Sequence, residues 1–203
     1  MRRLMLCVPM ISLLLAACGG GVQGSEAEQL ALLVRGEYLA MTSCAMEASI
    51  TADYGQRVYQ YELTARGEGE EMTLTLTAPE TVAGVTARLD GGTGLLEYDG
   101  VSVETGPLDG DGLTPMSALP ALLETARSGY IRACSLEDQE DGSRLLRMDC
   151  GQAEGQPGTG TEISLWFDPA TYALAQGEIT VDGFRVILCQ CSNFTFEKQE
   201  GSE

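Results

Sequence analysis

The chain has 203 residues, 44% of them hydrophobic, which is enough to bury a substantial core in one domain. Its 30 acidic residues outnumber 12 basic residues and give a net charge of -18. Nucleic acid and anionic lipid headgroups would repel such a surface, whereas a basic protein would not. Histidine is absent, which excludes Ser–His and Cys–His catalytic pairs and every zinc site that needs an imidazole ligand.

The N-terminus has the order of a secretory signal. Arg2 and Arg3 precede an apolar stretch from Leu4 to Ala17, and export machinery recognises a basic end, a short apolar core and small residues before the cut. As a helix this stretch would span about 21 Å, short of a hydrocarbon core roughly 30 Å thick. We therefore predict a cleaved signal peptide over residues 1–17 rather than a transmembrane helix.

The residues that end this segment, Leu15-Ala16-Ala17-Cys18, resemble the bacterial lipobox. The resemblance implies that Cys18 carries diacylglycerol through a thioether, becomes the first mature residue and holds acyl chains such as palmitate. Each buried methylene contributes about 0.8 kcal/mol, so two long chains would give a stable anchor. We expect a lipoprotein on the extracytoplasmic face of the cell membrane, with a mature net charge of -20 once Arg2 and Arg3 are removed. The alternative is an ordinary cleavage site with an accidental cysteine.

A tether and a helix are expected next. Residues 18–29 predict a lipidated cysteine with a flexible, Gly- and Glu-rich link; a single domain is expected over 30–198 and a disordered tail over 199–203. Ser25 and Glu28 have the spacing of a capping box, so an amphipathic helix is expected from about Ser25 to Ser43. Its apolar positions are Leu30, Leu33, Val34, Tyr38, Met41 and Ala45.

Beyond this helix the hydrophobic period changes to two, which is typical of half-buried strands separated by Gly- and Asp-rich turns. In mid-chain, Thr114-Pro115 starts a helical turn, the Leu119-Pro120 junction should interrupt it, and a helix is expected over 121–128, closed by Gly129. The strands are expected around 59–63 and 72–76, and later over 130–136, 145–150, 162–167, 174–181 and 184–196.

This order of elements resembles the LolA-like lipoprotein superfamily. That superfamily includes carriers of lipoproteins and lipids and the clostridial spore-germination lipoproteins of the GerS type. The resemblance implies a mainly β (α+β) fold, in which a strongly curved antiparallel sheet or incomplete barrel wraps around an N-terminal helix and a mid-chain helical insertion. The similar segments are Ala78-Pro-Glu-Thr-Val-Ala-Gly-Val, Leu95-Leu-Glu-Tyr-Asp-Gly, the helical stretch over 115–123, and Leu165-Trp-Phe-Asp-Pro.

A half-barrel of this kind would leave an apolar interior. Side chains from the helical insertion and the closing strands would then line a cavity able to hold acyl chains. A filled core fits the same residues, and the two alternatives point to different functions. The candidate cavity residues are Met116, Leu119, Leu122, Leu123 and Trp166.

The cysteines beyond Cys18 are odd in number, in a compartment where disulfides form. Cys134 and Cys150 lie on the two arms of an expected hairpin and are candidates for a bridge. Cys189 and Cys191 point to one face of the last strand. They could bind a soft metal or exchange thiols, or they could be small buried apolar side chains or part of a structural bridge. Cys44 completes the set.

Other chemistry is weakly indicated. Asp109-Gly110-Asp111-Gly112 has alternating carboxylates, but it lacks the downstream bidentate acid of a calcium loop and favours a simple turn. Most acidic residues fall in expected turns, where a solvated loop explains them. We expect no cofactor, no resident metal and no enzymatic activity.

Two functions from different classes remain. The first is a membrane-anchored, LolA-like protein that binds a hydrophobic ligand such as lipid or acyl chains, which needs a roomy apolar cavity. The second is a lipid-anchored interaction module that regulates an envelope or spore-cortex enzyme. The GerS-type resemblance implies sporulation and a peptidoglycan amidase partner for this second function, and a tightly filled interior would favour it.

Overall fold

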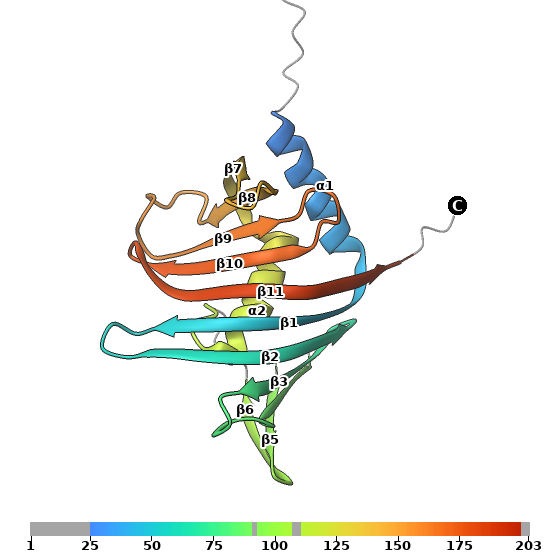
Figure 1. The fold of residues 1–203 in the computed structure, drawn as a ribbon, viewed down its shortest axis with the longest axis vertical. Helices are drawn as coiled ribbons and strands as arrows, with labels where there is room; N and C mark the ends of the chain where they lie inside the picture. Colours follow the sequence, from blue (N-terminus) through green and yellow to red (C-terminus); the bar gives the residue numbers. More distant parts are fainter. Residues whose placement is uncertain (1–24, 91–92, 107–110, 200–203) are drawn as a thin grey trace, which may run out of the picture.

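The structure is a computed structural model that describes residues 25–90, 93–106 and 111–199. Helices and strands occupy most of this part of the chain, and the predicted mainly β fold with an open antiparallel sheet is confirmed (Figure 1). The elements are α1 (Glu26–Ala40), β1 (Met41–Asp53), β2 (Val58–Glu68), β3 (Glu71–Ala78), β4 (Thr86–Asp90), β5 (Thr93–Tyr98), β6 (Val101–Gly106), α2 (Pro115–Ser128), β7 (Tyr130–Asp138), β8 (Arg144–Gly151), β9 (Thr161–Phe167), β10 (Leu174–Val181) and β11 (Phe184–Lys198).

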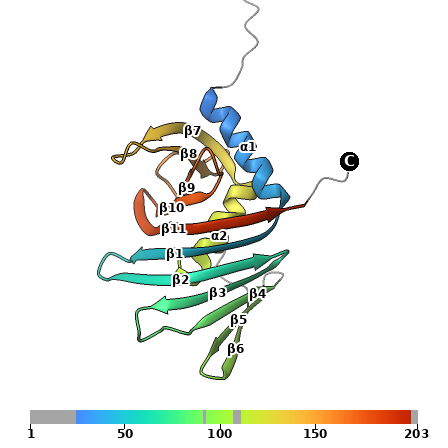
Figure 2. The same ribbon diagram turned by 45° about the vertical axis from the view of Figure 1, so that its right-hand side comes forward.

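The described strands form one sheet in the order β6-β5-β4-β3-β2-β1-β11-β10-β9-β8-β7. Two meanders, β1–β6 and β7–β11, meet at the centre, where β1 pairs antiparallel with β11. Because β6 and β7 are the two edges, the connection between them must cross the whole sheet. Helix α2 lies in that connection, on the same side of the sheet as α1 (Figure 2). We call the side that carries the helices the inner face, and the opposite side the outer face.

Helix α1 begins as the sequence predicts and ends earlier. Ser25 accepts a hydrogen bond from the Glu28 backbone N–H, and the Glu28 carboxylate accepts one from the Ser25 N–H, so the capping box forms. The helix starts inside the segment assigned to the tether over 18–29 and stops at Ala40 rather than Ser43. Met41 and Ala45 therefore belong to β1, and their expected place on the helix was wrong.

Strand β1 was missed because the helical assignment overran its start. From Cys44 onward its residues alternate between the two faces, and the inner ones are buried. The β-branched Ile50 and Thr51 are favourable in a strand. The strand then occupies the centre of the sheet, between β2 and β11. Its buried inner residues are Cys44, Met46, Ala48, Ile50 and Ala52.

Helix α2 is one continuous helix over Pro115–Ser128, so the predicted interruption at Leu119-Pro120 was wrong. Thr114 and Ser117 exchange side-chain to backbone hydrogen bonds in a second capping box, and Gly129 closes the helix. An internal proline costs about 3 kcal/mol. Burial of each apolar side chain contributes about 1.5–3 kcal/mol, and α2 completely buries several of them, which offsets that cost.

The two helices pack on different parts of the inner face. Helix α1 contacts α2, β7 and β8, while α2 contacts β1, β9 and β11. Between them, the buried Tyr38 ring of α1 forms an edge contact with Phe167, at 5.3 Å between ring centroids, and lies 6.0 Å from Phe194 and from Phe196. This aromatic cluster joins α1 to the last strands of the sheet.

Candidate functional site

Four of the five predicted cavity residues lie together on α2. Leu119, Leu122 and Leu123 are buried, and Met116 is partly buried against the same core. Trp166 is not with them. It alternates along β9 with Leu165 and Phe167, which face inward, so its ring lies on the outer face of the sheet. The expectation that Trp166 shares the interior failed because the period-2 alternation was read imperfectly across the closing strands.

The interior next to α2 is tightly filled. Leu122 lies directly on the backbone of Gly177 in β10, where a Cβ would come within 2.5 Å of the Leu122 Cδ1 atom. Gly112 is similarly close to α2 and β10, since a Cβ there would lie 2.7 Å from Ala121 and from Ile179. Here the cavity residues predicted from the sequence fill a core, as in ordinary close-packed protein interiors.

Trp166 instead anchors a charged network on the outer face. Its Nε1–H donates to the Glu137 carboxylate at 2.8 Å, and the Arg147 guanidinium lies 5.0 Å from the ring centroid. Arg147 is also paired with Glu137 and Asp149. Through its contacts with Glu137 and Arg147, Trp166 has a structural role on the outer face of the sheet.

We call strands β2–β6 the wing. Some apolar side chains on the inner face of the wing remain exposed. The helices make their main contacts with β1 and β7–β11. On the wing, Leu63, Leu74 and Ala87 are still buried, and the exposed apolar side chains lie mainly on β5 and β6. Tyr98, Val101 and Val103 are 51%, 63% and 55% exposed. Large exposed apolar side chains that gather on one surface mark binding sites more often than isolated ones do.

Strand register places these three residues on the inner face. Val103 pairs with Leu96 and Val101 with Tyr98, while Leu96 pairs with Ala87. Ala87 is buried in the core and pairs in turn with the buried Leu74. Directly paired residues share a face, so the exposed residues of β5 and β6 continue the inner apolar surface outward.

Partly buried residues connect this exposed area to the core. Tyr61, Met72, Leu89 and Leu96 pack against the core without being fully covered. At the β1–β2 end the Tyr59 and Tyr61 rings stack at 6.3 Å. Exposed or half-buried tyrosine and aliphatic side chains therefore lie on β2 and on β5–β6, while Leu63 and Leu74 of the same face are buried.

Tyr54 ties the wing to the chain that leads into α2. Its ring lies 6.1 Å from that of Tyr59, and its hydroxyl donates to the Leu113 carbonyl at 2.9 Å. Burial raises the pKa of Tyr54, and the neighbouring Tyr61 and Tyr59 add to the increase. This hydroxyl therefore stays protonated and acts as a hydrogen-bond donor at neutral pH.

Sequence reasoning did not single out Tyr98, Val101 or Val103. The signal that could have found them is the Asp99-Gly100 turn, which the sequence does reveal. A two-residue turn sets the register of the hairpin. Tyr98 and Val101 must then face each other across it, with Val103 and Leu96 one pair further along.

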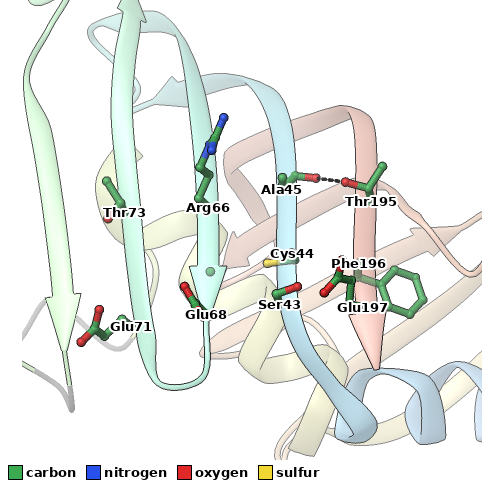
Figure 3. Close-up of a pocket in the computed structure, with 11 residues that line it drawn as sticks. Ser43, Cys44, Ala45, Arg66, Glu68, Glu71, Thr73, Thr195, Phe196 and Glu197 are labelled. Atoms are coloured by element: carbon green, nitrogen blue, oxygen red, sulfur yellow. Dashed lines mark hydrogen bonds between the residues drawn. The ribbon is translucent and has the colours of Figure 1, made fainter. Parts of the chain in front are cut away.

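A polar hollow of about 520 Å³ lies at β1, β2, β3 and β11 (Figure 3). Its walls carry the carboxylates of Glu68, Glu71 and Glu197 beside Arg66. These acidic walls are unsuited to an apolar ligand, and a carboxylate cluster that repels anions does not form a phosphate site.

Of the cysteines in the described residues, Cys44, Cys150 and Cys189 are buried, and Cys134 and Cys191 are partly buried. Cys134 pairs with Met148, and Cys150 pairs with Ile131, so the predicted bridge partners are offset along the β7–β8 hairpin. Both are free. Diagonal neighbours are about 7–8 Å apart, beyond the Cα separation that a disulfide tolerates. The hairpin register explains why the expected bridge is absent from this structure.

The Cys189 and Cys191 thiols do point to one face, with 3.8 Å between their sulfur atoms. The hydrogen bond to Cys191 and burial raise the pKa of Cys189, and burial raises that of Cys150 to about 11. Raised pKa values disfavour the thiolate, which is the reactive and metal-binding form. Within 25–90, 93–106 and 111–199, no three His, Cys, Asp or Glu side chains converge as metal ligands.

Two candidate sites that the sequence indicated lie wholly or partly outside the described residues. Cys18 is outside them, as is Asp109 of the acidic turn. Asp111 lies just before α2 and takes part in an interaction within the described chain. No helix among the described residues has the length and apolar character needed to cross a membrane.

No protein-family model and no curated protein matches the chain. Solved structures are similar over most of its length. An uncharacterized conserved protein from Thermus thermophilus is 9% identical, with a TM-score of 0.50 over 86% of this chain and 90% of that one. A LolA superfamily protein from Nitrosomonas europaea is 10% identical, with a TM-score of 0.43 over 86% and 94%.

The complex of the CwlD amidase with the GerS lipoprotein from Clostridioides difficile contains a further similar chain. It is 12% identical, with a TM-score of 0.38 over 89% of this chain and 96% of that one. At such identities the similarity concerns the fold alone. A LolA-like fold stays the expectation drawn from the sequence resemblance, and the open antiparallel sheet with its two helices agrees with it.

Proposed function

We propose that this protein is a noncatalytic envelope lipoprotein that binds a protein partner on the inner face of its wing. In this proposal residues 1–17 direct export, lipid on Cys18 holds the protein to the extracytoplasmic face of the cell membrane, and the LolA-like domain is the interaction module. The observation that carries the proposal is the exposure of Tyr98, Val101 and Val103 on an otherwise core-forming face.

The character of the wing favours a protein over a small ligand. A small apolar ligand usually enters a concave pocket that buries most of its surface, whereas Tyr98, Val101 and Val103 are 51%, 63% and 55% exposed. Tyrosine is enriched at protein interfaces because its ring is apolar and its hydroxyl is polar. Strand β6 is also an edge of the described sheet. The backbone N–H and C=O groups along that edge can therefore hydrogen-bond to an extended segment of a partner.

A second candidate function is binding of a hydrophobic ligand such as lipid or acyl chains. The half-buried Met72, Leu89 and Leu96 favour it, because they extend the apolar face toward the core. The packing of Leu122 on Gly177 disfavours it, since the interior next to α2 has no room for an acyl chain without movement of the helix.

Site-specific photocrosslinking in the native host tests both candidates. A photoreactive amino acid at Val103 would sample the inner face of β6, and one at the adjacent Ser102 would sample the outer face as a matched control. Both side chains are exposed. Mass spectrometry would identify what each position captures, and the resemblance to GerS-type lipoproteins makes a peptidoglycan amidase the first partner to look for.

The expected result is one envelope protein captured at Val103 and much less at Ser102. An acylated lipid captured at Val103 would instead support the ligand-binding alternative. Equal capture at the two positions, or capture only at Ser102, would contradict a binding site on the inner face of the wing.

A further inference from the structure

Helix α1 exposes three of its leucines while it buries two alanines. Its inner side is formed by Ala27, Ala31, Val34 and Tyr38, all buried. The side of the helix that points away from the sheet carries Leu32, Leu33 and Leu39, which are 70%, 54% and 66% exposed. Core packing alone does not explain a helix that turns alanines inward and three leucines outward, because the leucines would contribute more if buried.

These leucines lie on one uncharged surface. At 100° per residue, Leu32, Leu33, Gly36, Leu39 and Ala40 fall on the same side of the helix, and we call them the α1 stripe. Of the charged residues that flank the stripe, Glu26 and Glu28 in the first turn are exposed, whereas Arg35 and Glu37 turn toward the protein. Arg35 donates to the carbonyls of Arg127 and Gly129 at the end of α2, and Glu37 pairs with Lys198 at 2.7 Å.

We infer that the α1 stripe rests in the interface of the membrane that holds the protein. This inference rests on the proposed lipid anchor at Cys18, and it adds a second, noncovalent contact that orients the domain. A helix with one apolar side lies in the plane of a membrane with that side about 5–10 Å deep. The first turns of α1 extend past the sheet (Figure 1), and the leucines of the stripe are exposed.

The length of the chain between the anchor and the helix makes the membrane the favoured occupant. Residues 19–25 separate Cys18 from the first residue of α1. Eight residue steps span at most about 29 Å in any conformation, so the start of α1 stays near the bilayer surface. Leu32 is about 9 Å and Leu39 about 20 Å along the helix axis from Glu26, and both can lie at the surface if the helix is parallel to it.

Charge specifies the kind of membrane surface. The mature chain carries a net charge of -20, so anionic headgroups oppose close approach. The uncharged stripe is suited to zwitterionic lipid, and the leucines supply the attraction. This arrangement is the opposite of a basic amphipathic helix that depends on anionic lipid.

Depth-dependent quenching tests this inference on the full lipoprotein, purified from its host with its anchor and reconstituted in phosphatidylcholine vesicles that contain brominated lipid. Leu39→Trp reports on the α1 stripe. Val101→Trp, at a similarly exposed apolar position of β6, is the matched control. The native Trp166 supplies the background, because it is buried on the outer face of β9.

We expect brominated lipid to quench the added emission several-fold more in Leu39→Trp than in Val101→Trp, and phosphatidylglycerol to reduce the difference. Equal quenching in both variants would overturn the inference, and so would a dimer by native mass spectrometry in which Leu39→Trp is shielded from lipid. Stronger quenching in Val101→Trp would place the wing on the membrane and contradict the proposed partner site as well. The mass of the intact protein reports separately whether Cys18 carries the lipid, so failure of the anchor is distinguishable.

Discussion

Leu122 of α2 and Gly177 of β10 are in direct contact, and the absence of a side chain at position 177 makes that contact possible. A Cβ at Gly177 would lie 2.5 Å from Cδ1 and 2.8 Å from Cδ2 of Leu122. Real Cβ atoms do not approach other atoms so closely, so any larger residue at 177 must displace the Leu122 side chain or the helix that carries it. The contact between Leu122 and Gly177 therefore determines how closely α2 packs on β10.

Gly177→Ala is expected to destabilise the protein by about 1–3 kcal/mol, because an added methyl group in a filled core forces the surroundings to move. Urea denaturation would measure the loss as a lower midpoint. Gly36→Ala is the matched control: Gly36 lies on the exposed side of α1 with open space around it. In a helix that exchange should stabilise by about 0.5–1 kcal/mol. A Gly177→Ala variant as stable as the unmodified protein would contradict the contact.

Tyr38→Phe is expected to leave stability unchanged or to raise it. The Tyr38 hydroxyl is buried without a hydrogen bond of normal geometry in the described part of the chain, and burial raises its pKa. Removing an unsatisfied buried hydroxyl removes a desolvation cost of about 1–3 kcal/mol. Thermal unfolding would compare the variant with Tyr38→Ala, which should lose about 3–5 kcal/mol through loss of the aromatic cluster. A large loss in Tyr38→Phe would reveal an essential hydroxyl contact.

Arg35→Ala is expected to destabilise the protein by about 1.5–3 kcal/mol, because charged hydrogen-bond donors contribute that much. Arg35 holds α1 to α2 through bonds of 3.0 Å to the Arg127 carbonyl and 2.7 Å to that of Gly129. Arg88→Ala, which breaks an exposed pair with Glu97, should cost less than about 1 kcal/mol. Chemical denaturation of the two variants would measure both losses of stability. A larger loss in Arg88→Ala than in Arg35→Ala would contradict this prediction.

Stability is expected to fall between pH 9 and 11 because of Cys150. Burial raises its pKa from 9.0 to about 11 in the folded protein. The folded state therefore holds the proton more tightly than the unfolded state does. Its contribution is complete below the unfolded pKa and is lost as the pH rises through the folded one.

The loss attributable to Cys150 is roughly 2–3 kcal/mol. Denaturation at pH 8, 9, 10 and 11 would measure it, with Cys150→Ala as the variant in which this part of the slope should disappear. An unchanged slope in Cys150→Ala would assign the pH dependence to other groups.

Local sequence signals predicted much of the fold. The capping pair Ser25 and Glu28 located the start of α1, and Gly129 located the end of α2, because these residues satisfy backbone groups that every helix leaves unpaired. Alternation and turns located the strands from β2 onward. The same local signals misled at Met41 and at Pro120, where the central position of β1 and the burial of α2 outweighed local preference.

The sequence by itself determined most of the helices and strands, their order and the acidic, histidine-free chemistry, because these depend on near neighbours and composition. Only the tertiary structure decided which apolar residues are covered. Periodicity separates Leu33 from Val34 and Trp166 from Phe167, but it does not say which residue of each pair lies against the core. The exposure of Val103 and Leu39 likewise depends on how far α1 and α2 reach across an open sheet. That reach is set by long-range contacts such as Leu122 with Gly177, which link residues too far apart for periodicity to reveal.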